Sequence, residues 1–263
     1  MIDQKVSLIL DPAISLIKEV GEFIKMEATR FDRSMVKTKG LNDLVSYVDK
    51  EAEVRLIRGL KKLLPNSGFV AEEGTEEQTN NDYQWIVDPL DGTTNFIHGI
   101  PVYSVSVALT FRKKLVLGIV YEINKDECFW GSSEGAFCND KPIQVSDQKN
   151  LSDGIIATGF PYNNFENLSG YMNILTTLMK SCHGIRRFGS AAVDLAYVAC
   201  GRFEGFFEYN LNPWDVAAGA FIVECAGGKV TDFKSGNDFI FGRHIVAGNE
   251  THAELLQIVQ DNW

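Results

Sequence analysis

Residues 85–96, WIVDPLDGTTNF, restrict the possible folds of this chain more than any other stretch. The apolar run at residues 85–87 is typical of a buried strand, and it ends on a carboxylate, Asp88, at the edge of the predicted sheet. The Asp-Pro and Asp-Gly steps that follow favour a tight turn, which brings Asp88, Asp91 and the carbonyl of Leu90 toward one point. Because these ligands are all oxygens, the segment predicts a hard cation such as Mg²⁺ at the end of a strand.

The residues after this turn offer hydrogen-bond donors to an anion. The amides of Gly92 and Thr93, together with the Thr93 hydroxyl, can point at a group held on the cation. A turn with two surface aspartates would explain the Asp-Gly step, but not the sequence Asp-Pro-Leu-Asp directly after a buried strand. The chain lacks both the ligand pattern of an EF-hand and a G-x-x-x-x-G-K-[ST] phosphate loop. The motif therefore favours a metal ion that holds a phosphate group.

Composition limits the function classes that fit. The chain has 263 residues, 45% of them hydrophobic, which is enough for one large domain or two closely packed halves. The net charge of −10 disfavours nonspecific nucleic-acid binding and means that a phosphate substrate needs a local cation. The five widely spaced cysteines fit neither a zinc site nor a disulfide framework. With neither a signal-peptide pattern nor a membrane-length apolar run, we expect a soluble, cytoplasmic protein without a membrane partner.

The first 150 residues combine helices with a sheet. Apolar residues at helical spacing predict a helix over residues 14–26 that starts at Pro12, with residues 6–10 as an alternative, earlier and kinked turn of the same helix. The polar residues 30–42 predict a loop or loose hairpin, and a second helix is expected over residues 49–64. Short turns then favour an antiparallel sheet with strands at residues 69–70, 85–87, 105–111, 115–123, 127–130 and 135–145, the last around an Asn139-Asp140 turn.

Strands and helices alternate in the remainder of the chain. The change near residue 150 predicts two subdomains without a flexible linker, an α+β unit at residues 1–150 and an α/β unit at residues 151–263. A layered α/β fold with two halves fits this order. The expected strands are residues 155–159, 185–188, 203–208, 230–231 and 244–247, and the expected helices are residues 169–180, 190–199, 214–225 and 249–260.

Five motifs resemble the inositol monophosphatase family. That family carries D-P-x-D-G-T-x-N-F in its middle and W-D-x-A-A-G near its C-terminus, as this chain does at residues 88–96 and 214–219. All five motifs occur in the family's order at compatible spacing, so the resemblance covers nearly the whole chain. It implies an alternating α-β-α-β-α sandwich. The other three matches are NDLVS at residues 42–46 followed by Asp49, AEEG at residues 71–74 and GSAA at residues 189–192.

The resemblance implies that two or three Mg²⁺ ions bind in the first subdomain, with one ligand from the second. Crowded carboxylates raise each other's pKa, and a bound cation makes such a cluster tolerable. Taken alone, Asp215 in the first turn of a helix would be interpreted as a cap, and both roles are compatible. The implied ligands are Glu72 and Asp88, each shared between two ions, the carbonyl of Leu90 at the first ion, and Asp91 and Asp215 at the second.

By the same resemblance, Glu72, Thr93 and Asp49 position and deprotonate the attacking water. The local sequence alone favours a simple helix cap for Asp49. Lys39 lies in a spacing that many bacterial relatives share and reaches the edge of the metal cluster, with Lys37 as the alternative. The implied contacts of the substrate are Asp91, Gly92, Thr93, Thr94, Gly189, Ser190, Ala191, Glu208, which binds substrate hydroxyls, and Asp215.

The reaction that the resemblance implies is hydrolysis of a small phosphate monoester by metal-activated water, with no covalent intermediate. Myo-inositol 1-phosphate is the default substrate, and the 2′-phosphate of NADP(H) is the alternative because the compact loop at residues 74–83 leaves room for it. Relatives on this core also process fructose 1,6-bisphosphate and 3′-phosphoadenosine 5′-phosphate. Arg186 and Arg187 could contact a second phosphate or form structural ion pairs.

Three further expectations come from the family alone. The resemblance implies inhibition by lithium and a homodimer. Some bacterial members act through protein contacts in transcription complexes, so a non-catalytic regulator is a competing hypothesis. The intact metal-ligand positions of this chain favour an active enzyme.

Overall fold

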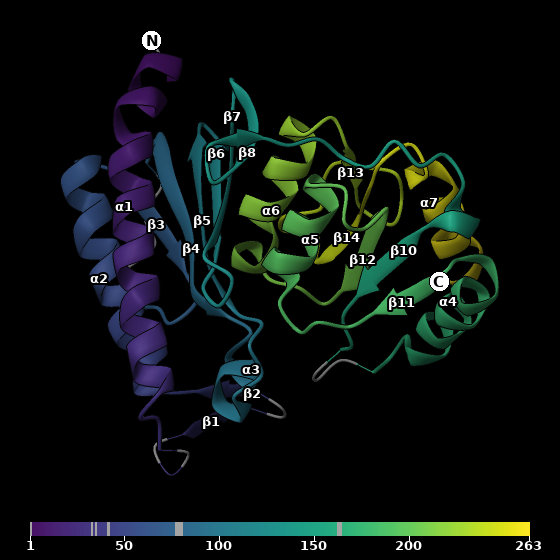
Figure 1. Cartoon of the computed structure of the whole chain (residues 1–263), viewed down its shortest axis with the longest axis horizontal. Helices are drawn as coiled ribbons and strands as arrows, with labels where there is room; N and C mark the ends of the chain where they lie inside the picture. Colours follow the sequence, from purple (N-terminus) through teal and green to yellow (C-terminus); the bar gives the residue numbers. More distant parts are fainter. Residues whose placement is uncertain (1, 33, 35, 41–42, 77–80, 162–164) are drawn as a thin grey trace.

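The structure is a computed structural model that describes residues 2–32, 34, 36–40, 43–76, 81–161 and 165–263. Two β-sheets and three pairs of helices form alternating layers (Figure 1), which confirms the expected α-β-α-β-α sandwich. No helix within these ranges combines the length and apolar character that crossing a membrane requires. The outer pair on the first sheet is α1 (Ile2–Ala28) and α2 (Tyr47–Leu63), the central pair is α5 (Ala191–Ala199) and α6 (Pro213–Cys225), and the outer pair on the second sheet is α4 (Leu168–Ser181) and α7 (His252–Asn262).

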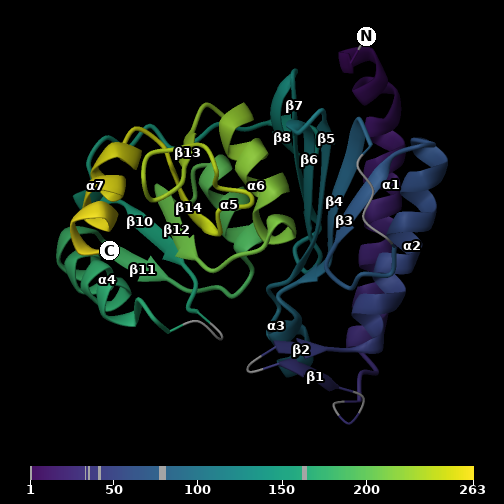
Figure 2. The same cartoon turned by 180° about the vertical axis from the view of Figure 1, so that it is seen from behind.

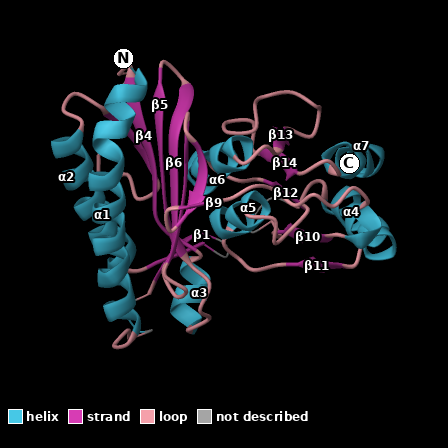
Figure 3. Ribbon diagram, turned by 45° about the horizontal axis from the view of Figure 1, so that its top comes forward, coloured by secondary structure: helices cyan, strands magenta, loops and turns pink. Residues whose placement is uncertain are grey.

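The first sheet is buried on both faces. Along β4, Trp85 and Val87 pack in the core that includes α1 and α2, whereas Ile86 packs in the core that includes α5 and α6. This double burial explains a continuous apolar run where a one-sided strand would alternate. The sheet is antiparallel apart from its parallel pair β3–β4. Figure 3 shows α1 and α2 beside this sheet. Its strands, in spatial order, are β3 (Gly68–Ala71), β4 (Tyr83–Asp91), β5 (Ser104–Phe111), β6 (Lys114–Glu122), β7 (Glu127–Ser132), β8 (Gly135–Cys138) and β9 (Lys141–Pro142).

The second sheet is mixed. Strand β10 is parallel to its two neighbours, whereas β14 is antiparallel to both of its own. In β12, Phe206 packs toward the central helices and Phe207 toward α4 and α7, so this sheet also separates two cores (Figure 2). Its strands, in spatial order, are β11 (Gly184–Arg186), β10 (Ile155–Thr158), β12 (Gly205–Tyr209), β14 (His244–Gly248) and β13 (Lys229–Thr231), and the 3₁₀ turn η2 (Leu151–Asp153) precedes β10.

The first helix differs from its main prediction. Helix α1 runs without a break through Pro12, so the prediction that it starts there is wrong and the alternative of one longer helix is correct. Val6, Ile9 and Leu10 continue the buried stripe of the helix, and this burial outweighs the backbone hydrogen bond that the proline removes. The carbonyl that loses this bond belongs to Leu8, on the exposed side of the helix, where water can solvate it.

Two small elements complete the fold beside the site. Strands β1 (Lys37–Gly40) and β2 (Asp43–Val45) pair antiparallel, in agreement with the loose hairpin expected there. Helix α3 (Thr93–His98), which was not predicted, follows β4 directly. The segment expected as a strand around an Asn139-Asp140 turn is the hairpin β8–β9, and the turn is confirmed, with φ of 45° and 62° at these two residues. The strand itself ends at Pro142, before the predicted residue 145.

Candidate metal and phosphate site

Three predicted metal ligands meet at the end of β4. Asp88 and Asp91 lie in the last residues of that strand, and Asp215 lies in the first turn of α6. One carboxylate oxygen from each residue lies within 4.8 Å of the others. Asp88 is only 2% exposed. The structure therefore brings together oxygen ligands that are 124 positions apart in the sequence between Asp91 and Asp215.

Burial and mutual repulsion raise the pKa values of these carboxyl groups. Burial raises the pKa of Asp88 well above its usual range, and the neighbouring Glu72, Asp91 and Asp215 raise it further. Burial raises the pKa of Asp91 to about 6 and that of Asp215 to about 7. Buried carboxylates at such spacing are stable in the ionised form when a cation lies between them. An all-oxygen donor set of this charge fits Mg²⁺.

Asp91 is oriented by the start of α5. Its Oδ2 accepts hydrogen bonds from the Ser190 hydroxyl at 2.6 Å and from the Ala192 amide at 2.8 Å. The positive end of the helix dipole supports the ionised form there. Ser190, predicted to contact substrate, therefore has a second task, because it is both the N-cap of α5 and a donor to Asp91.

Two glycines allow this close approach between the halves. Gly92 and Gly189 have φ of +95° and +85°, in the left-handed region that glycine adopts without strain. A Cβ on Gly92 would lie only 3.2 Å from the Gly189 carbonyl oxygen. At both positions the backbone can adopt this conformation because glycine has no side chain.

Asp215 also has two local roles. Its Oδ2 accepts a hydrogen bond from the Asn212 amide at 2.6 Å, which closes a capping box at the start of α6. Pro213 occupies the first helical position, where its missing amide costs nothing. The helix-cap interpretation and the placement beside Asp88 are both correct for this residue.

Asp49 reaches the site through Thr93. Its Oδ1 accepts a hydrogen bond of 2.8 Å from the Thr93 hydroxyl, and its Oδ2 caps α2 by accepting from the amide and hydroxyl of Ser46. The Thr93 hydroxyl also lies 3.0 Å from the carbonyl oxygen of Leu90. It has one proton, and donation to Asp49 leaves that carbonyl free to bind a cation.

A cavity of about 270 Å³ opens beside the carboxylates. Thr93 and Thr94 contribute the first amides of α3, which have no acceptor within the helix. Every predicted metal and substrate residue lines this cavity. Asp49 lies behind Thr93 and is only 1% exposed. The side chains of Lys37 and Lys39 lie outside the described part of the chain. The lining residues that were predicted are Glu72, Asp88, Leu90, Asp91, Gly92, Thr93, Thr94, Gly189, Ser190, Ala191, Glu208 and Asp215.

The cavity contains one buried acid that sequence reasoning missed. Asp194 of α5 is 1% exposed, and within the described chain its Oδ1 has no hydrogen-bond partner. Burial raises its pKa well above the usual range, and Glu208 raises it further, whereas Arg187 lowers it. Arg187 lines the cavity, and Arg186 is exposed outside it. The available signal was a lone carboxylate in the apolar run AAVDLA at the start of α5.

The buried Asp88, the half-buried Asp91 and Asp215, two helix N-termini and a small cavity form an arrangement that suits a metal ion and a phosphate group. The model of the inositol monophosphatase family matches residues 5–263. The chain therefore belongs to the inositol monophosphatase family, and membership supports a phosphatase.

Individual relatives agree with this assignment. The Nus factor SuhB of Pseudomonas aeruginosa is 40% identical over 258 residues, which cover 95% of each chain. The inositol-1-monophosphatase of Mesorhizobium japonicum is 39% identical over 252 residues, again 95% of each chain. The crystal structure of the extragenic suppressor protein suhB of Bartonella henselae superposes with a TM-score of 0.91 at 38% identity and covers 97% of this chain and 99% of that one.

Proposed function

We propose that this protein is a Mg²⁺-dependent phosphatase of small phosphate monoesters, with myo-inositol 1-phosphate as the first substrate to test. The observation that carries the proposal is the trio Asp88, Asp91 and Asp215, whose oxygens lie within 4.8 Å of one another beside a cavity. A bound Mg²⁺ would supply charge for the phosphate oxygens and lower the pKa of a water.

Carboxyl, carbonyl and amide groups of the protein bind the metal ions and stabilise the phosphate in this proposal. The groups that would hold the ions are Asp88, Asp91, Asp215, Glu72 and the Leu90 carbonyl. The first amides of α3 point at the phosphoryl oxygens and stabilise the charge that spreads over them in the transition state. Fixed donors of this kind need no reorientation during the reaction.

Thr93 and Asp49 orient the attacking water. The Thr93 proton is directed to Asp49 Oδ1, at 2.8 Å, so a lone pair of the Thr93 oxygen can accept a hydrogen bond from the water. Glu72 accepts the proton that the water loses. The buried Asp49 carboxylate sets the direction of the Thr93 hydroxyl without reaching the cavity itself.

The size and lining of the cavity favour a compact polyol phosphate. A volume of about 270 Å³ suits a sugar-sized group rather than a whole dinucleotide. Glu208 and Asp194 offer carboxyl groups to substrate hydroxyls, and Arg187 balances their charge. With NADP(H), only the phosphorylated ribose would occupy the cavity.

Phosphate release with and without Mg²⁺ tests this proposal. The substrates to compare by kcat/KM are inositol 1-phosphate, NADP⁺, fructose 1,6-bisphosphate and 3′-phosphoadenosine 5′-phosphate. We expect Mg²⁺-dependent release with a preference for inositol 1-phosphate, and Asp91→Asn should be folded and inactive. If folded wild-type protein releases no phosphate from any of these four substrates in ample Mg²⁺, the proposal of a phosphatase is refuted.

A second candidate function follows from the relatives named Nus factor SuhB, which are 38–40% identical to this chain. A role of that kind would rest on protein contacts instead of turnover. Expression of Asp91→Asn in a strain without the wild-type gene separates the two, because only a phosphatase role requires the intact site. Inhibition by lithium, a homodimer and the binding of two or three Mg²⁺ ions stay predictions.

A further inference from the structure

Glu53 is a buried carboxylate that the mechanism above does not use. It lies on α2 one helical turn after Asp49 and is 0% exposed. Its Oε2 accepts a hydrogen bond of 2.7 Å from the Glu73 amide. Its Oε1 accepts from the Thr75 amide at 2.8 Å and from the Thr75 hydroxyl at 2.6 Å. All three donors belong to the segment that directly follows Glu72.

This segment is folded around the carboxylate. Gly74 has φ of +64°, and the left-handed residue turns the amides on either side of it toward Glu53. Converging backbone amides of this kind form a concavity that binds anions. Here the anion is a side chain of the protein itself, presented from a helix that packs against β4. A buried carboxylate with three donors is a strong and directional attachment.

The attachment restricts Glu72 from its C-terminal side. On the N-terminal side, the Glu72 amide donates to the Val87 carbonyl at 3.3 Å, next to Asp88. The backbone of Glu72 is thus held by one strand pair and, one residue later, by Glu53. Both attachments hold the backbone from which the Glu72 side chain extends, and the Glu72 carboxyl group is close enough to Asp88 to raise its pKa.

We propose that Glu53 is a positioning residue for metal binding, which holds the Glu72–Thr75 segment so that Glu72 faces Asp88. Helix α2 then supports the site twice, through Asp49 on Thr93 and through Glu53 on this segment. The inference rests on the proposed function, because Glu72 is a metal ligand only there. Groups that orient ligands in this way affect metal affinity strongly although they do not touch the ion.

The test is Mg²⁺ binding to the substrate-free protein by isothermal titration calorimetry. Glu53→Gln keeps the size of the side chain but turns an NH₂ group toward amide donors, and we expect Mg²⁺ affinity about 10- to 100-fold weaker. Thr75→Ala removes one of the three bonds from an exposed residue, and we expect a loss of about 3- to 5-fold. Glu51→Gln, the same change on the exposed face of α2, is the matched control and should bind like wild type.

Each outcome decides the inference. Wild-type Mg²⁺ affinity in folded Glu53→Gln overturns it, and if that variant does not fold, wild-type affinity in Thr75→Ala overturns it alone. A positioning role also predicts that KM at saturating Mg²⁺ stays within about twofold of wild type in Thr75→Ala, and a large change in KM contradicts it. If wild type binds Mg²⁺ but releases no phosphate, the proposed function fails, while weaker binding by both variants still supports the positioning role.

Discussion

Replacing Asp215 with asparagine should stabilise the metal-free protein above neutral pH while it abolishes turnover. Burial, and then the charge of Asp91, raise the pKa of Asp215 from 3.8 to about 7. A carboxyl group whose pKa is higher in the folded state disfavours folding once it ionises. Stability is therefore lost as the pH rises from about 4, the pKa in the unfolded chain, to about 7, and the loss is complete above that value.

The size of the effect follows from the same difference. About three pH units at about 1.4 kcal/mol each give an upper limit of about 4 kcal/mol at pH 8. Asp88 and Asp91 remain in the variant and still repel each other, so the gain falls below this limit. We therefore expect the free energy of unfolding to rise by about 2–4 kcal/mol. The asparagine oxygen can still accept the Asn212 amide, now 2.6 Å from Oδ2, so the cap of α6 is kept. For a chain of this length the gain corresponds to a melting temperature about 5–10 °C higher.

Thermal unfolding in a chelator, followed by circular dichroism, measures this gain. Asp215→Asn should melt above wild type at pH 8, and the difference should shrink as the pH falls toward 5. Added Mg²⁺ should raise the melting temperature of wild type more than that of the variant. Asp3→Asn, the same change in the exposed first turn of α1, is the control and should show neither effect. An Asp215→Asn variant no more stable than wild type at pH 8 without metal would refute the reasoning.

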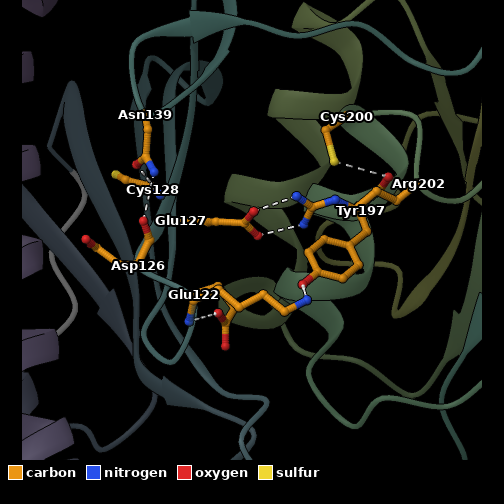
Figure 4. A network of polar contacts seen from close by, with 9 residues as sticks. Glu122, Asp126, Glu127, Cys128, Asn139, Tyr197, Cys200 and Arg202 are labelled. Carbon is orange, nitrogen blue, oxygen red and sulfur yellow. Dashed lines mark hydrogen bonds and ion pairs between the residues drawn. The ribbon is translucent and has the colours of Figure 1, made fainter.

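Three further substitutions test separate parts of the structure. In steady-state assays Thr93→Val should lower kcat at least about 100-fold, while its melting temperature stays nearly unchanged. A kcat equal to that of wild type would reject the role of Thr93 in orienting water. Ser190→Ala removes the 2.6 Å bond to Asp91 and the cap of α5, so urea unfolding should show a loss of about 1 kcal/mol. Arg202→Ala breaks the ion pair of two hydrogen bonds, 2.6 and 2.5 Å, between Arg202, in the turn after α5, and Glu127 of β7 (Figure 4). Urea unfolding should show a loss of about 1 kcal/mol in stability while KM is unchanged, and a changed KM would link this pair to the site.

The sequence predicted those parts of the site that lie close together in the chain. Asp88 and Asp91 are only three residues apart at the end of β4, so residues 85–96 were sufficient to predict a cation there. The tight turn expected directly after Asp88 is wrong, because β4 continues to Asp91 with an irregular register between the two aspartates. Asp215 was placed by resemblance, because its local sequence indicates only a helix cap. The layered fold followed from the order of strands and helices and was confirmed.

The unpredicted features depend on contacts between distant segments. The continuation of α1 through Pro12 was only an alternative from the sequence, because the choice depends on a buried stripe that only the packed sheet provides. Ser190 supports Asp91 from 99 residues away, so no local pattern reveals the bond. Glu53 resembles a surface charge of an amphipathic helix, and its role depends on the segment that folds over it. A lone acid on an apolar helical stripe, as at Asp194, is the signal that would have indicated such residues.

The most direct test of a metal-dependent phosphatase is phosphate release from inositol 1-phosphate by wild type and Asp215→Asn, each titrated with Mg²⁺ from a chelated start. Turnover that rises from zero with Mg²⁺ in wild type, and stays at background in a variant that is folded and more stable without metal, is the predicted result. Phosphate release by wild type in the absence of Mg²⁺, or undiminished release by Asp215→Asn, would contradict the role of the carboxylate cluster.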